Sequence, residues 1–209
     1  MIKVVYIDEE VGWQSTAYAA LSGKYDLYIP EVLPKNVSDL WEEIRDSQVA
    51  VIDYRLNESD LSYTGDDVVR EIHKHNKHFP TIIITSYEDN AIQECTEIQT
   101  IRGKEMFNTS EGLKKLCHMI DSAAAIYEKK KADSENTILS LQEKRSAGEA
   151  LSEVEEADRY DAEQYLSELD MDSSARGVLI NTKTLKGLEE MLFLARTIVS
   201  NHKNVKENG

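Results

Sequence analysis

The chain has 209 residues, 41% of them hydrophobic, and a formal net charge of −15 at pH 7. This length and composition allow one domain of ordinary size with an additional element, and they exclude a disordered polar tail because enough apolar side chains are present for a core. The excess of acids argues against a nucleic-acid partner, since phosphate binding requires clustered Lys and Arg.

The cysteines and the hydropathy pattern indicate the compartment. Cys95 and Cys117 lack the spacing of a metal site, and the residues after Met1 do not form a signal peptide. No apolar run approaches the length needed to span a bilayer. We therefore expect a cytoplasmic protein, in a reducing environment and with no membrane partner.

The N-terminal part alternates short apolar runs with helical patterns, which is typical of a parallel sheet built from βα units. Five strands are predicted, over residues 3–7, 25–29, 49–53, 81–85 and 97–103. Helices are predicted over residues 10–21, 40–44, 65–75 and 91–94, and from Ser110 onward. Ser38 is expected to cap the second of these helices. Residues 1–127 are therefore expected to form a doubly wound, five-stranded parallel α/β sandwich.

Residues 128–209 contain no convincing strand and predict an all-α or coiled-coil region. Seven positions follow steps of three and four: Ile120, Ala124, Tyr127, Lys131, Ser134, Ile138 and Leu141. This spacing predicts that the helix starting at Ser110 continues past the first domain and pairs with another helix. The region would serve output, dimerisation or docking of a partner.

Two further helices are predicted in this region. Ser152 and Glu155 form a capping box, and the apolar side of the helix that follows would carry Val154, Ala157, Tyr165, Leu166 and Leu169. A third helix is predicted over 185–199. Residues 149–172 contain ten acids and one base, which we interpret as a solvated helix face rather than a functional acidic surface.

Polar side chains follow four of the predicted strands: Asp8 and Glu9, then Asp53, then Thr85 and Ser86, and finally Lys104. In a parallel sheet these positions meet at one edge. Crowded carboxylates repel one another and require a cation, and an all-oxygen set favours Mg²⁺. A carboxylate beside the metal can attack a phosphoryl donor and form an acyl phosphate, and Asp53 is the natural choice because it ends the central strand.

The segments YIDEE, VIDYR, GDDVVREI, IIITSYEDNA and RGKEMF occur in this order and resemble the response-regulator receiver domain of bacterial two-component signalling. The resemblance covers residues 1–127 and leaves the helical C-terminal extension unrecognised. It implies that Asp53 accepts phosphate from a histidine kinase or a phosphotransfer protein. It implies no other enzymatic activity than this transfer and a slow self-dephosphorylation at Asp53.

The same resemblance assigns roles to the other edge residues. Asp8, Glu9 and Asp53 would hold Mg²⁺ together with the backbone carbonyl of Arg55. Thr85 would be the hydroxyl that moves toward the phosphate, and Lys104 the cation that pairs with it.

The sequence leaves three functions open. The preferred one is a response regulator whose C-terminal helices self-associate or bind a protein partner when Asp53 is phosphorylated. The alternative is a pseudo-receiver that serves as an unphosphorylated scaffold subunit of a larger complex, and the long segment 55–64 after the central strand favours it. A Mg²⁺-dependent phosphohydrolase or nuclease would need a second acid two residues past Asp53, where Arg55 stands instead.

Overall fold

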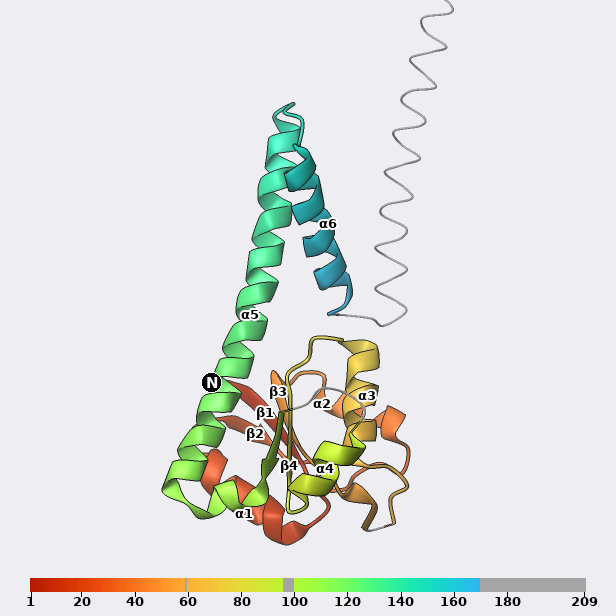
Figure 1. The fold of residues 1–209 in the computed structure, drawn as a ribbon, viewed down its shortest axis with the longest axis vertical. Helices are drawn as coiled ribbons and strands as arrows, with labels where there is room; N and C mark the ends of the chain where they lie inside the picture. Colours follow the sequence, from red (N-terminus) through yellow and green to blue (C-terminus); the bar gives the residue numbers. More distant parts are fainter. Residues whose placement is uncertain (59, 96–99, 170–209) are drawn as a thin grey trace, which may run out of the picture. The chain divides into compact units, whose positions relative to one another are not determined.

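The computed structural model describes residues 1–58, 60–95 and 100–169 (Figure 1). It contains one five-stranded sheet with the order β2-β1-β3-β4-β5, and every neighbouring pair of strands is parallel. The strands are β1 (Lys3–Ile7), β2 (Asp26–Tyr28), β3 (Val49–Asp53), β4 (Thr81–Thr85) and β5 (Thr100–Gly103). The predicted doubly wound sheet is confirmed.

Six α-helices are described: α1 (Val11–Leu21), α2 (Trp41–Ile44), α3 (Gly65–His75), α4 (Glu88–Glu94), α5 (Ser110–Ser146) and α6 (Glu153–Ser167). Short 3₁₀ turns lie at η1 (Val37–Asp39), η2 (Leu56–Glu58) and η3 (Lys104–Asn108). Within this described part, no helix combines the length and the hydropathy that a membrane crossing requires. The helix predicted over 185–199 lies outside the described residues.

Helices cover both faces of the sheet (Figure 1). Val5 and Ile7 of β1 pack in a cluster with side chains of α2, α3 and α4. Val4 and Tyr6 of the same strand point the other way and pack with side chains of α1 and α5. All residues of β3 are buried, as its unbroken apolar run predicts for a central strand covered on both sides.

Helix starts differ from the sequence predictions at α2 and at α4, which begins at Glu88 and not at the predicted Ala91. Thr64 caps α3, and its side chain and that of Asp67 form a reciprocal capping box. The prediction that Ser38 caps the second helix is wrong. The side chain of Asn36 instead accepts a hydrogen bond from the backbone N–H of Ser38, which opens η1, and α2 begins only at Trp41.

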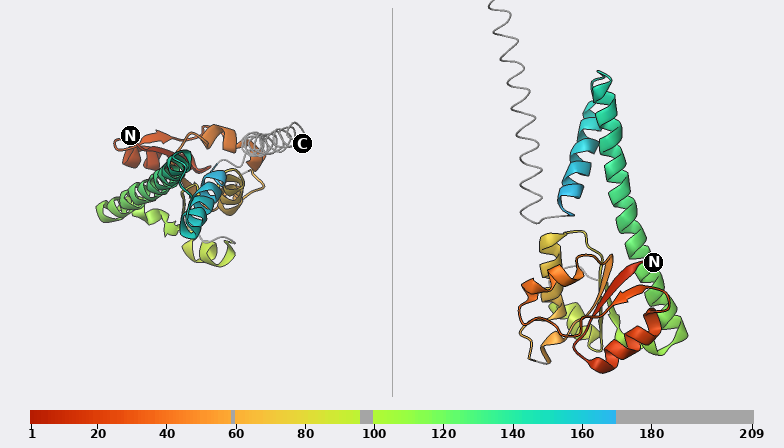
Figure 2. Two further views of the ribbon diagram at one scale, coloured as in Figure 1. Left: turned by 90° about the horizontal axis from the view of Figure 1, so that it is seen from above. Right: turned by 180° about the vertical axis from the view of Figure 1, so that it is seen from behind.

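Helix α5 runs for 37 residues and continues well past Tyr127, as predicted, and α6 returns along its far half (Figure 2). Ser152 caps α6 through the predicted capping box. The predicted apolar side of α6 is wrong at its start, because Val154 is 70% exposed and Ala157 is exposed as well. Ala162 and Tyr165 are buried instead. Leu141 of α5 is also buried.

The end of α6 contacts the turn between α3 and β4. The backbone N–H of Lys77 donates to the carbonyl oxygen of Glu168 over 2.9 Å. The Glu168 carboxylate also pairs with Lys77 Nζ at 2.9 Å and with His78 Nε2 at 2.7 Å. The His78 ring lies 4.4 Å from the ring of Tyr165. These contacts join the helical hairpin of α5 and α6 to the α/β sandwich at a point distant in sequence.

Candidate functional site

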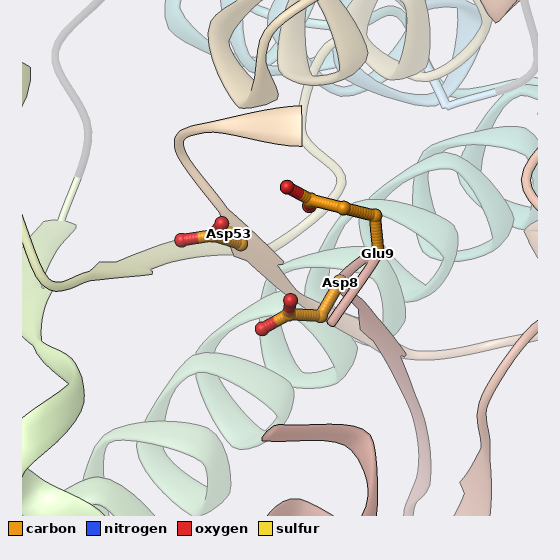
Figure 3. Close-up of side chains that lie close together, drawn as sticks. All are labelled: Asp8, Glu9 and Asp53. Atoms are coloured by element: carbon orange, nitrogen blue, oxygen red, sulfur yellow. The ribbon is translucent and has the colours of Figure 1, made fainter. Parts of the chain in front are cut away.

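Three carboxylates meet at the carboxyl edge of the sheet (Figure 3). Asp8 and Glu9 directly follow β1, and Asp53 ends β3, the strand that pairs with β1. One carboxylate oxygen from each residue lies within 4.8 Å of the others. The structure therefore brings together the three acids that the strand pattern placed at this edge.

Lys104 enters the same site from the end of β5. Its Nζ lies 2.8 Å from Asp8 Oδ2 and 3.2 Å from Asp53 Oδ1, and all three side chains are almost fully buried. Burial alone would lower the pKa of Lys104, but the two carboxylates outweigh it and raise that pKa. The ammonium group therefore stays charged and bridges the two buried acids.

The Asp8 carboxylate has partners on both of its oxygens. Oδ1 accepts a hydrogen bond of 2.9 Å from the backbone N–H of Glu10, and Oδ2 accepts one of 2.6 Å from the hydroxyl of Tyr6. Oδ2 is also the oxygen that faces Lys104. The side chain is thus fixed in one orientation by the backbone after β1 and by a neighbour within β1.

The remaining two acids carry unfavourable charge when no cation is bound. Burial, with Asp8 nearby, raises the pKa of Asp53 to about 6 although Lys104 opposes the shift. Burial and the charges of Asp53 and Asp8 raise the pKa of Glu9 to about 7. Among the residues that the structure describes, Glu9 Oε2 is the buried side-chain oxygen without a hydrogen-bond partner.

These features fit a divalent cation. An unpartnered buried oxygen and three converging carboxylates supply hard oxygen ligands of the kind that Mg²⁺ prefers. Burial and the neighbouring carboxylates raise the pKa values of Glu9 and Asp53, and a bound cation would favour the charged form of both acids.

Thr85 and Arg55 lie beside Asp53. Thr85 ends β4, is fully buried, and its hydroxyl oxygen accepts a hydrogen bond of 3.1 Å from the backbone N–H of Tyr87. The guanidinium carbon of Arg55 lies 3.7 Å from the centre of the Tyr87 ring. The start of α4 is therefore connected to the site through both Thr85 and Arg55.

Gly65 permits the close approach of α3 to the site. A Cβ atom at this position would lie 2.2 Å from the backbone oxygen of Asp53, which is far inside contact distance. The N–H of Gly65 donates to the carbonyl oxygen of Tyr54 over 2.8 Å. The backbone around Asp53 is therefore supported by the first turn of α3, and only glycine fits there.

Sequence reasoning missed three of these neighbours. Tyr6 stands two residues before Asp8 in a strand, and this spacing could have placed both side chains on one face. The position of Gly65 predicts a helix start, but its contact with the backbone of Asp53 follows only from the packing of α3 on the sheet. The proximity of Trp13, whose ring centre lies 5.2 Å from Lys104 Nζ, left no signal in the sequence because it depends on tertiary packing.

No family model matches the chain, and no curated protein matches it. Similar solved structures do exist. A response regulator receiver domain protein from Clostridium thermocellum is 20% identical with a TM-score of 0.48, and the match covers 61% of this chain and 98% of that one. The N-terminal signal receiver domain of a two-component response regulator from Bacteroides fragilis is 16% identical with a TM-score of 0.45, covering 59% and 97%.

The RcsB response regulator of Salmonella typhimurium is 13% identical with a TM-score of 0.44, and the match covers 79% of this chain and 92% of that one. These identities and TM-scores are too low to carry a conclusion about this chain. The strand order and the helices on both faces by themselves define a doubly wound, parallel α/β fold followed by a helical extension. Function has to be inferred from the chemistry of the site.

Proposed function

We propose that the protein is a response regulator in which Asp53 accepts a phosphoryl group from a histidine kinase or a phosphotransfer protein. The observation that carries this proposal is the buried Lys104 ammonium, which bridges Asp8 and Asp53 beside the unpartnered oxygen of Glu9. A charged amine at this point neutralises the buried acids, and it stands where it can pair with a phosphoryl group on Asp53.

The chemistry is one transfer followed by slow hydrolysis. A carboxylate oxygen of Asp53 attacks phosphorus, the phosphorus–nitrogen bond of the donor phosphohistidine breaks, and the leaving imidazole takes up a proton. Mg²⁺ held by Asp8, Glu9, Asp53 and the backbone carbonyl of Arg55 would neutralise the charge of the phosphoryl oxygens. Water later hydrolyses the acyl phosphate, and we propose no other catalysis.

The switch would begin at Thr85. Its hydroxyl now accepts the hydrogen bond from the Tyr87 N–H, and turning toward a phosphoryl oxygen would require it to give up this bond. Because Tyr87 precedes α4 and contacts Arg55, the loss would shift the start of α4. Phosphorylation would thus change the surface that α4 contributes.

The output would be carried by the helices. Helix α5 leads directly from the sandwich into the hairpin with α6, so a change at the sandwich surface can alter how the hairpin meets another protein or a second copy. We propose protein partners and a bacterial cytoplasmic setting, in line with the free thiols of Cys95 and Cys117.

The test uses the full chain with Mg²⁺ and beryllofluoride, which mimics a phosphoryl group on a carboxylate. Amide hydrogen exchange of α4 and α6 and solution size are compared with and without the mimic, in wild type and in Asp53→Asn. The proposal predicts changes in wild type alone. An identical response of both proteins, or none in either with the fold intact, would contradict it and would favour the unphosphorylated scaffold.

A further inference from the structure

Tyr6 lies beside the acidic site and takes no part in the transfer proposed above. It is fully buried in β1, and its hydroxyl donates to Asp8 Oδ2 over 2.6 Å. Side chains alternate along a strand, so residues two apart share a face, and this brings the Tyr6 hydroxyl to the carboxylate that follows the strand. The contact is thus built into β1 itself.

The Tyr6 ring has little freedom to move. It packs edge to face on Phe107, with ring centres 5.9 Å apart and an angle of 84° between the planes. Phe107 belongs to η3, the turn that begins with Lys104. The two groups that meet Asp8 Oδ2, a hydroxyl and an ammonium, are therefore held by elements packed against each other.

The Tyr6 hydroxyl is a permanent donor. A phenol hydroxyl is neutral and can donate one hydrogen bond, and here that bond goes to Asp8 Oδ2. The hydrogen bond therefore orients Asp8 without adding a charge to the site. Lys104 differs in this respect, because its ammonium group is charged and could turn toward a phosphoryl group on Asp53. Asp8 Oδ2 would then lose one of its two partners.

We propose that Tyr6 is a positioning residue for the cation: its hydroxyl holds the Asp8 carboxylate in the orientation that Mg²⁺ binding needs. Mg²⁺ accepts little departure from octahedral geometry, and partners that orient its ligands contribute strongly to affinity. This inference rests on the proposed function, because the cation is the one that phosphorylation of Asp53 requires.

The test is calorimetric titration of the full chain with Mg²⁺ for wild type, Tyr6→Phe and Tyr25→Phe. Tyr25 is a matched control, because it is also buried and its hydroxyl bonds with Asp121 at 2.9 Å, away from the three carboxylates. Loss of the Tyr6 hydroxyl is expected to raise the Kd for Mg²⁺ roughly tenfold. The control variant is expected to keep the wild-type Kd.

A second measurement does not depend on the folding of Tyr6→Phe. In wild type labelled with ¹³C at the tyrosine ring carbon that bears oxygen, the Tyr6 resonance is expected to shift with the same midpoint as the calorimetric titration.

The outcomes separate the two proposals. No Mg²⁺ binding by wild type would overturn the metal site and the role of Tyr6 together. Binding by wild type with an unchanged Kd in folded Tyr6→Phe, or with an unperturbed Tyr6 resonance, would overturn the role of Tyr6 and leave the proposed function standing. Equal weakening in Tyr6→Phe and Tyr25→Phe would show a general effect of lost core packing and would also overturn it.

Discussion

The ionised Asp53 carboxylate should destabilise the metal-free protein. Burial, with Asp8 nearby, raises its pKa from 3.8 to about 6. Because the folded state binds the proton more tightly than the unfolded state, the free energy of unfolding falls as pH rises from about 4 to about 6 and then levels off. We therefore predict that Asp53→Asn stabilises the metal-free protein at pH 8 and has little effect near pH 4.

The magnitude follows from the pKa values. A difference of about two pKa units at about 1.4 kcal/mol each corresponds to about 3 kcal/mol at pH 8. This value already contains the attraction between Asp53 and Lys104, which opposes the rise in pKa. In the variant, Lys104 still has Asp8 as its partner. For a chain of this length it corresponds to an increase in Tm of roughly 6–12 °C.

The assay is thermal and urea unfolding in EDTA at the two pH values. Asp121→Asn is the control, because its carboxylate pairs with Lys24 at 2.6 Å and hydrogen bonds lower its pKa although burial opposes them. The ionised Asp121 carboxylate stabilises the folded protein above about pH 4, and this contribution is lost on acidification. Asp121→Asn should therefore be less stable than wild type at pH 8. Destabilisation by Asp53→Asn at pH 8, or an effect independent of pH, would refute the reasoning.

Two further predictions concern packing. Gly65→Ala should cost about 1–3 kcal/mol in unfolding experiments, because its Cβ would meet the backbone oxygen of Asp53, whereas Gly12→Ala in α1, with nothing within 4 Å, should be neutral or stabilise by up to about 1 kcal/mol. Equal effects would argue against the close approach at Asp53. Leu141→Ala should cost about 2–4 kcal/mol and speed amide exchange in α6, whereas Leu139→Ala, at a position 58% exposed, should change stability by less than about 0.5 kcal/mol. Unchanged exchange in α6 with Leu141→Ala would contradict the packing of the hairpin.

Local sequence signals predicted the sheet and the convergence at its edge well. The apolar run of β3 and the acid at its end are local features, and the parallel arrangement brings Asp8, Glu9 and Asp53 together whatever the details of the loops. The length of α5 could also be predicted, because the positions at steps of three and four continue through Leu141 without a helix breaker.

Two features could not be predicted from the sequence. At the second helix, Asn36 and Ser38 are both good capping residues by type, so the pattern alone does not decide where the helix starts. The buried side of α6 is set by its contact with α5 and by the pairing of Glu168 with His78, 90 positions apart in the sequence, so its own periodicity wrongly included Val154. At α6, tertiary packing therefore decided which side of the helix is buried.

The most direct test of the central claim is intact-mass measurement after incubation of the full chain with acetyl phosphate, with and without Mg²⁺. The account predicts one phosphoryl adduct that requires Mg²⁺, is absent from Asp53→Asn, and maps to the peptide that contains Asp53. Absence of any adduct from folded wild type, or an adduct that persists in Asp53→Asn, would contradict it.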